Sequence, residues 1–430
     1  MGKINSASWR SRLRFLLITF LGFAISMMIN FPFWAIAQPL SMDTASNTID
    51  QSPSNQVDQS APPNLPLIRP LNGNELRGIW LTNVDSDVLF SAQNLERAIK
   101  RLKRLKFNTL YPTVWNGGYT LYPSKVAEAS FGVSVDPIPE LQERDMLAEA
   151  IKFGHEQNFA VIPWFEYGLM TEEGSELMSK HPDWISQRKD GSHVFLHGEK
   201  DQHRLAWLNP AHPQVQKLLI DLIVEVVTKY DVDGIQLDDH FGMPTELGYD
   251  DYTITLYKKD HFGRLPPEDI NNPAWMQWRA KYITSLMRKI SKSVRAIKPN
   301  CLISLSPNPK DFSYKKYLQD WYNWVYLKYI DELIVQVYRD DIDNFKRELE
   351  QPELQEIRLK IPVAVGILTG LRVQNVDMRQ IKGQVKIVRE LNLDGFSFFF
   401  YETLGNRDAS FETLLFAPAS RPDLRNIASS

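Results

Sequence analysis

The sequence has little cysteine and no excess of charge of either sign. Cys301 is the single cysteine in 430 residues, so no internal disulfide can form, and a buried thiol is its expected state. The chain has 49 lysine and arginine residues and 52 aspartate and glutamate residues, which gives a formal net charge of −3. The chain therefore lacks the basic excess that nucleic-acid binding rewards, and we expect no nucleic-acid partner.

Several catalytic signatures are also missing. No G-x-S-x-G nucleophile elbow occurs, and LNGNELRG (71–78) lacks the spacing of a phosphate-binding loop. Acyl transfer by serine and hydride transfer are therefore disfavoured. His193, His197 and His203 fall in one polar stretch, but their spacing matches no strong zinc pattern, so we expect neither a metal nor another cofactor. A metal-dependent deacetylase built on these histidines is the least favoured alternative.

The N-terminal region has the pattern of an export signal. Arg10, Arg12 and Arg14 precede an uncharged apolar run, 15–37, that ends in Ala-Ile-Ala. Residues 1–37 are predicted to be a cleaved signal peptide or an uncleaved membrane anchor, and either form exports the remainder to the periplasm or cell envelope. Membrane contact is expected through this segment alone.

The rest of the chain divides by composition. Residues 38–70 are rich in Ser, Asn, Gln, Asp and Pro without periodicity, which predicts a disordered linker. Residues 71–418 are predicted to form one large domain, and 419–430 a C-terminal tail. The stretch from 169 to 210 is long and weakly periodic, which predicts a loop insertion that acts as a lid or subsite.

Within the domain, short apolar runs of β-type residues alternate with helical patterns. The runs are 76–82, 107–115, 159–168, 232–241, 302–309, 332–339, 362–368 and 394–402. Helical spacing is clearest in 94–105, 145–158, 215–227, 278–297 and 378–391. Strand then helix, repeated eight times, predicts an α/β fold, the (β/α)8 TIM barrel, with a doubly wound open sheet as the alternative.

Functional residues of such a barrel lie at the carboxyl ends of the strands, and strand alternation predicts which side chains point inward. In DGIQLDDHF (233–241), Ile235 and Leu237 suit packing against helices. The inward face then carries Gln236, Asp238 and His240. Asp239 has the opposite parity if the strand continues that far.

The same alternation places neutral polar residues inside the later strands. These are Ser304, Ser306 and Asn308 in one run and Gln336 and Tyr338 in the next. Such donors and acceptors suit sugar hydroxyls better than an anion. Aromatic side chains that could stack on sugar rings are Trp80, Trp115, Trp164, Tyr167 and Trp207. Each of these aromatics could instead be part of the core.

Glycoside hydrolysis needs a second carboxylate beside the first. Glu166 ends the third run and Glu402 the last, so both are candidates beside Asp238 and Asp239. Each acid also has a structural alternative. An aspartate at a strand end often caps a helix, and a glutamate can pair with an arginine such as Arg339 or Arg407.

Five segments in order resemble the bacterial glycosyl-hydrolase-like 10 family. They are ELRGIWLTNVDS, YDVDGIQLDDHF, the SPN after the fifth run, DELIVQVYR and DGFSFFFYE, and the similarity runs from about residue 75 to 416. The resemblance implies an exported (β/α)8 barrel related to glycoside hydrolases that works on cell-envelope glycans. It places the family's acidic motif on Asp233, Asp238 and Asp239, with Asp233 at the start of the strand and away from the active face.

Two functions follow as expectations. The first is a glycoside hydrolase acting on a cell-envelope glycan such as peptidoglycan strands, with Asp238 as nucleophile or base and Glu166 as general acid. The second is a non-catalytic glycan-binding or scaffolding protein that keeps the barrel and the aromatics without a working pair of acids.

Overall fold

A computed structural model describes residues 73–197, 203–371 and 374–422. The predicted signal or anchor (1–37) and linker (38–70) lie outside these described residues, as do 423–430 of the predicted tail. In the described part of the chain, no helix has both the length and the apolar character needed to cross a membrane.

The centre of the molecule is a nine-stranded sheet in which all pairs are parallel. The strand order is β5-β2-β1-β16-β13-β12-β11-β10-β6. The strands are β1 (Leu76–Leu81), β2 (Thr109–Pro112), β5 (Ala160–Val161), β6 (Trp164–Phe165), β10 (Gly234–Asp238), β11 (Leu302–Ser306), β12 (Glu332–Gln336), β13 (Val363–Leu368) and β16 (Gly395–Phe399). Each of the eight predicted runs contributes to this sheet.

The third predicted run forms two short strands, β5 and β6. Pro163 stands between them and has no N–H to donate to a strand ladder. The Ile162 N–H donates to the carbonyl of Leu110 in β2, while the Pro163 carbonyl accepts from the Gln236 N–H in β10. This run thus bonds to β2 on one side and to β10 on the other, and the sheet is curled. The arrangement is consistent with the predicted TIM barrel.

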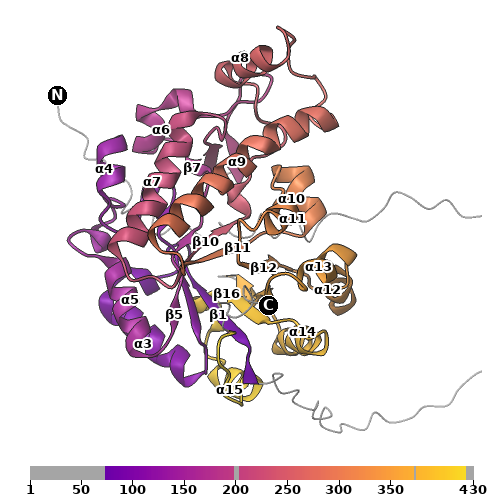
Figure 1. The fold of residues 1–430 in the computed structure, drawn as a ribbon. Coiled ribbons are helices and arrows are strands. Elements are labelled where there is room, and N and C mark those ends of the chain that lie inside the picture. The colour runs from indigo at the N-terminus through magenta and orange to yellow at the C-terminus, as the bar shows by residue number, and fades with distance from the viewer. Residues whose placement is uncertain (1–72, 198–202, 372–373, 423–430) are drawn as a thin grey trace, which may run out of the picture.

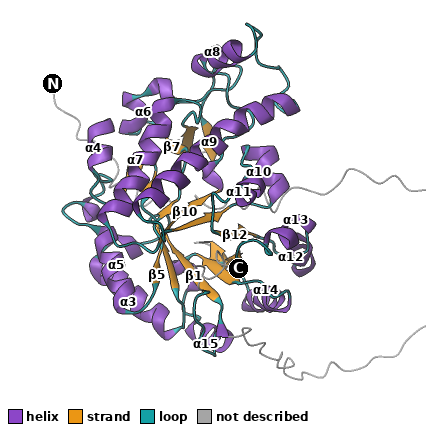
Figure 2. Ribbon diagram, viewed as in Figure 1, coloured by secondary structure: helices purple, strands orange, loops and turns teal. Residues whose placement is uncertain are grey.

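Helices alternate with these strands and surround the sheet (Figure 1, Figure 2). The five predicted helices are α3 (Ala92–Arg104), α5 (Met146–Glu156), α7 (Pro213–Lys229), α9 (Pro273–Ile297) and α14 (Met378–Glu390). Shorter ones are α4 (Lys125–Phe131), α6 (Glu176–Lys180), α8 (Asp251–Asp260), α10 (Lys310–Tyr317), α11 (Trp321–Tyr326), α12 (Ile342–Leu349), α13 (Pro352–Ile357) and α15 (Asp408–Leu414). In Figure 1, α8 and the start of α9 project away from the sheet.

Two apolar clusters confirm the predicted alternation. Ile235 and Leu237 belong to the large cluster packed between sheet and helices. A smaller cluster fills the inside of the curled sheet, and it includes Trp80, Trp164 and Tyr338. The period of two along each strand therefore separates an outward apolar face from a mixed inward face.

At the amino ends of the strands, one polar side chain repeatedly ties a strand to its neighbour. A side-chain oxygen of the residue just before one strand accepts a backbone N–H from the first or second residue of a neighbouring strand. The pairs are Asn108 with Arg77, Asp233 with Val161, Asp331 with Ile303, and Asp394 with Val363. Asp233 thus has a structural role at the end opposite Asp238, as the sequence predicts.

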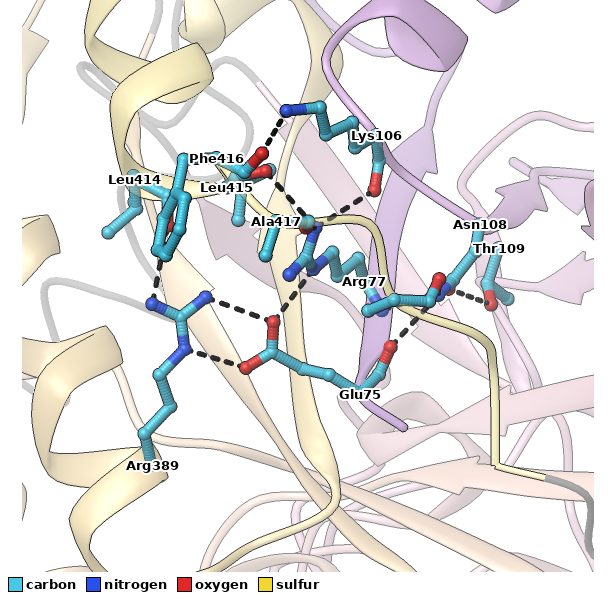
Figure 3. A network of polar contacts seen from close by, with 11 residues as sticks. Glu75, Arg77, Lys106, Asn108, Thr109, Arg389, Leu414, Leu415, Phe416 and Ala417 are labelled. Atoms are coloured by element: carbon cyan, nitrogen blue, oxygen red, sulfur yellow. Dashed lines mark hydrogen bonds and ion pairs between the residues drawn. The ribbon is translucent and has the colours of Figure 1, made fainter. Parts of the chain in front are cut away.

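A buried ion network joins the first strand to the C-terminal segment (Figure 3). The Glu75 carboxylate, 3% exposed, accepts from Arg77 Nε at 2.7 Å and from Arg389 Nε at 2.7 Å. Arg77 also donates to the carbonyls of Leu415 and Ala417. Each guanidinium therefore has charge and hydrogen-bond partners, as buried cations require.

Residues that the sequence assigns to the tail pack against the same end of the sheet. Ser420 pairs with Asn74 beside β1. Arg421 forms an ion pair with the buried carboxylate of Glu332, which also accepts from the Tyr111 hydroxyl at 3.3 Å. The chain is thus anchored near both limits of the described domain.

The stretch predicted as a long loop contains regular structure. Between β6 and α7 lies a three-stranded antiparallel sheet, β7 (Met170–Glu172), β9 (His203–Trp207) and β8 (Phe195–His197). Two antiparallel pairs lie outside this stretch: β3 (Trp115–Asn116) with β4 (Tyr119–Thr120), and β14 (Gly370–Leu371) with β15 (Gln374–Asn375). The long segment after β6 thus contains short strands that the sequence did not predict, because strands this short give too few residues for a readable period.

Candidate active site

The acidic motif lies where β10 ends. The strand finishes at Asp238, and a 3₁₀ helix over Asp239–Phe241 begins at once. Because the chain turns there, strand alternation no longer decides where Asp239 points. Potential ligand atoms of Asp238, Asp239 and His240 all lie within 4.8 Å of one another. Asp239 therefore lies beside Asp238 and His240, although an extended strand would have placed it on the opposite face.

Asp238 is a buried acid with a raised pKa. Its side chain is 1% exposed, and its Oδ2 accepts from the Trp164 indole Nε1 at 3.1 Å. Burial raises the pKa of Asp238 to about 7, against the charge and hydrogen bond of His240, while the charges of Asp239 and Glu166 add to the rise. A carboxyl group with this pKa can give up a proton near neutral pH.

Asp239 is surrounded by donors. Its side chain is 5% exposed; Oδ2 accepts from Asn308 Nδ2 at 3.1 Å and Oδ1 from Gln336 Nε2 at 2.9 Å. Gln336 is itself oriented by a second bond to the Ser306 carbonyl. Both carboxylate oxygens of Asp239 therefore have an amide donor. Both amides are residues that the sequence placed inside the sheet.

His240 connects the acids. Its Nδ1 lies 2.9 Å from the Glu166 carbonyl oxygen and 3.3 Å from Asp238 Oδ2, which are both acceptors. Burial lowers the His240 pKa, but the charges of Asp239 and Asp238 outweigh it and raise the pKa to about 10. The ring is 25% exposed, far more than Asp238. An imidazolium therefore stands at the solvent side of the cluster.

Glu166 directly follows β6 and is held by three donors. Thr82, Thr113 and Asn116 donate to Oε2 at 3.2, 3.0 and 2.9 Å, and among the described residues none donates to Oε1. Burial raises the pKa of Glu166, while these hydrogen bonds and the charge of His240 oppose the rise. Glu166 thus accepts three hydrogen bonds that oppose the rise in its pKa, whereas the charges of Asp239 and Glu166 add to the rise in the pKa of Asp238.

The floor of the site is a hydrogen-bonded layer. Gln236 is fully buried; its Oε1 accepts from Trp80 Nε1 at 2.7 Å, and its Nε2 donates to Ser304 at 3.0 Å. The first bond crosses the inside of the curled sheet from β1 to β10, and the second joins β10 to its neighbour β11. Gln236 and Trp80 therefore support the acids from below.

The predicted aromatic residues separate into two groups. Trp80, Trp164 and Tyr338 lie together inside the sheet, with Trp80 and Trp164 ring centroids 6.2 Å apart. The second group belongs to the large core cluster and consists of Trp115, Tyr167 and Trp207, each at most 3% exposed. These three residues therefore pack in the core between the sheet and the surrounding elements.

Glu402 lies apart from the other acids. It stands on a 3₁₀ helix (Tyr401–Leu404) after β16, and it lines a cavity of about 640 Å³ that is not lined by Asp238, Asp239 or Glu166. Burial raises its pKa to about 7, opposed by a hydrogen bond from Ser86. The structure thus brings three of the four predicted acids together and separates the fourth.

The arginine pairs considered as alternatives for these glutamates do not form. Arg339 pairs with Glu348 at 2.8 Å, and Arg407 donates to the backbone carbonyls of Val376 and Thr369. Glu166 and Glu402 are consequently not neutralised by these cations.

A cation could in principle use Asp238, Asp239 and His240, the cluster of three ligand residues found in the described part of the chain. His193 and His203 are not in it. The carboxylate oxygens already face donors from Trp164, His240, Asn308 and Gln336. A metal would compete with those donors, so the donor set fits proton chemistry better.

Some residues of the site were not found from the sequence. Thr82, Thr113 and Asn116 converge on Glu166, and Gln319 Nε2 donates to the Asp238 carbonyl at 2.7 Å. Thr82 ends the first predicted run and Thr113 lies in the second, so a search for polar residues at every strand end would have found both.

An α/β sheet with carboxylates and neutral polar groups at its carboxyl edge is typical of glycoside hydrolase-like proteins. The chain belongs to the family described as Glycosyl hydrolase-like 10, which matches residues 75–388. The resemblance found in the sequence is therefore confirmed.

Curated relatives carry the same type of name. The chain is 24% identical over 289 residues to Glycosyl hydrolase DigH of Escherichia coli (strain K12), an alignment covering 59% of this chain and 60% of that protein. It is 22% identical over 257 residues to Glycosyl hydrolase YngK of Bacillus subtilis (strain 168), covering 54% and 45%. The alignments thus span less than two thirds of each relative.

A solved structure supports the fold. The glycoside hydrolase domain of PgaB (BpsB) from Bordetella bronchiseptica superposes with a TM-score of 0.57 at 11% identity, over 79% of this chain and 99% of that domain. At this identity the likeness concerns the fold alone.

Proposed function

We propose that this protein is an exported glycoside hydrolase that cleaves a cell-envelope glycan, such as peptidoglycan strands, by a two-carboxylate mechanism. The observation that carries the proposal is the pair of buried carboxylates, Asp238 and Glu166, in contrasting environments beside neutral amide donors. In this account the curled sheet is a closed (β/α)8 barrel whose insertion after the third strand borders the site.

The environments suggest a division of roles that reverses the one expected from sequence. Asp238 has a pKa of about 7 and sits beside the charge of Asp239, so it serves as proton donor to the leaving oxygen. Glu166, with three donors on one oxygen, serves as the ionised partner, nucleophile or base. Burial holds the pKa of Asp238 near neutral, the charge of Asp239 adds to this rise, and His240 opposes it.

The envelope location rests on residues 1–37. Their arginines and apolar run support export, and a glycan of the envelope is the substrate available there. Fractionation of cells producing the full chain tests this step, and recovery in the cytoplasm would contradict it.

The function is tested by mass spectrometry of products formed from intact peptidoglycan and from peptide-free glycan strands. Three proteins are compared: wild type, Asp238→Asn, and Asp233→Asn as a matched control at the opposite end of the same strand. We expect new saccharide fragments from wild type and Asp233→Asn, and none from Asp238→Asn.

The second candidate function, glycan binding without cleavage, is favoured by one observation: Asp238, Asp239 and Glu166 are each at most 5% exposed. If all three proteins bind the glycan and none produces fragments, the hydrolase proposal fails and the binding role replaces it.

A further inference from the structure

A polar cavity lies at the same end of the sheet as the acidic cluster. Its volume is about 640 Å³, within the range of small-molecule sites. It is formed by the segments that follow β1, β13 and β16, which are neighbours in the sheet, whereas β10 lies four places from β16 in the strand order. The lining residues that matter here are Ser86, Asn94, Arg97, Asn375, Tyr401 and Glu402.

The cavity contains a carboxylate oxygen that lacks a donor. Glu402 Oε2 is buried and has no hydrogen-bond partner among the described residues. Leaving such an atom unsatisfied is unfavourable, so a ligand that supplies an O–H or N–H gains affinity by pairing with it. Asn94, Asn375 and Ser86 add neutral hydrogen-bonding groups, and Tyr401 adds an aromatic ring.

The charges of the lining exclude an anion as the preferred ligand. Asp85, Asp87 and Glu402 contribute three carboxyl groups beside Arg97 and Arg101. The Arg101 guanidinium is already held by a carboxylate of α15. A phosphate would meet more negative than available positive charge, whereas a polyhydroxylated or amino sugar matches the mixture of donors and acceptors.

Two chain segments connect this cavity with the proposed active site. Thr82 donates to Glu166, and the same loop lines the cavity from Asp85 onward. Phe399 contacts Trp80 inside the sheet with ring centroids 5.8 Å apart, two residues before Tyr401 of the cavity. The two sites therefore share walls on the β1 and β16 side.

We infer that this cavity binds a further sugar unit of the glycan chain, remote from the bond at Asp238, with Glu402 Oε2 accepting a hydroxyl or amino hydrogen. The inference rests on the proposed function, because it assumes that a glycan lies across the site. Glu402 then selects long chains and takes no part in bond cleavage.

The experiment measures kcat and KM of the full-length chain on peptide-free peptidoglycan oligomers of increasing length, together with calorimetric binding of the same oligomers. The variants are Glu402→Gln, Asn375→Ala on the exposed rim, and Glu96→Gln, a control on α3 whose side chain pairs with Lys100 and does not line the cavity. For Glu402→Gln we expect KM and Kd to rise as the oligomer lengthens, by about 10-fold for the longest, with kcat little changed. Asn375→Ala should show the same trend, and Glu96→Gln should match wild type.

Two kinetic outcomes overturn the inference. If Glu402→Gln lowers kcat and raises KM equally for oligomers of every length, Glu402 acts in catalysis. If neither constant changes at any length, the cavity does not bind the glycan. If wild type cuts no oligomer, the hydrolase proposal fails, yet length-dependent binding that is weakened by Glu402→Gln would still support the subsite. Absence of binding by wild type would overturn both.

Discussion

The pH dependence of glycan hydrolysis should move when Asp239 loses its charge. If Asp238 donates the proton, kcat/KM falls as pH rises through the Asp238 pKa, about 7. The negative charge of Asp239 raises that pKa, so Asp239→Asn should lower it and shift the alkaline limb to lower pH.

The size of the shift follows from the geometry. The Asp238 and Asp239 oxygens lie within 4.8 Å of one another. Two charges at that distance interact by roughly 1 kcal/mol in water and about 3.5 kcal/mol at an effective dielectric constant of about 20. Since 1.36 kcal/mol corresponds to about one pH unit, the limb should move by roughly 0.6 to 2.5 pH units.

Asp239→Asn is expected to fit the site. Gln336 Nε2 is fixed by the Ser306 carbonyl, but Asn308 Oδ1 is buried without a partner among the described residues. Asn308 can therefore turn its amide and accept from the new side chain. His240, with a pKa of about 10, has enough margin to stay protonated near neutral pH when one acidic neighbour is lost.

The assay is a pH profile of kcat/KM for wild type, Asp239→Asn and the control Asp233→Asn, whose carboxylate lies at the other end of β10. A limb that stays in place in Asp239→Asn, or moves to higher pH, would refute the reasoning. A shift of equal size in Asp233→Asn would show that the effect is not local.

Three further predictions concern stability. Glu75→Gln leaves two buried guanidinium groups without their carboxylate and should lower the free energy of unfolding in urea by about 3–5 kcal/mol. The control Glu96→Gln, in an exposed ion pair, should lower it by about 0.5 kcal/mol or less. Equal losses in the two variants would contradict the role of the network. Gly234→Ala places a Cβ 2.6 Å from the Leu302 carbonyl oxygen and should lower the free energy of unfolding by about 1–3 kcal/mol. A variant as stable as the wild type would show that β10 and β11 can move apart at little cost. The pKa of Glu402 in the folded protein, about 7, exceeds the usual 4.5, so the stability of the wild type should fall as pH rises between these two values. Glu402→Gln should therefore be more stable than the wild type at pH 8 but not below pH 4.5. A gain in stability that does not depend on pH would refute the raised pKa.

Much of the strand framework could be predicted because alternation has a period of two wherever a strand is long enough. Ile235 and Leu237 pack outward, and Asp238 faces inward, as the pattern in β10 predicts. The same pattern failed at Asp239, where a 3₁₀ turn replaces the strand. Alternation is a property of extended backbone and ends with it.

Which acids would meet could not be read from the sequence. Glu166 and Glu402 both end strands, yet one is held beside Asp238 and the other lines a separate cavity. Strand ends specify an edge of the sheet but not the distance around it. The three donors on Glu166 come from two segments, one after β1 and one after β2, and only tertiary structure brings these segments to Glu166.

The most direct test of the central claim compares leaving groups. Asp238→Asn and wild type are assayed on peptide-free glycan and on a dinitrophenyl glycoside of the same sugar, whose leaving group departs without a proton. If Asp238 is the proton donor of a glycoside hydrolase, kcat/KM of the variant should fall by about 100- to 10,000-fold on the glycan and far less on the aryl glycoside. Equal loss on both substrates would contradict that role and make Asp238 the nucleophile or a structural residue.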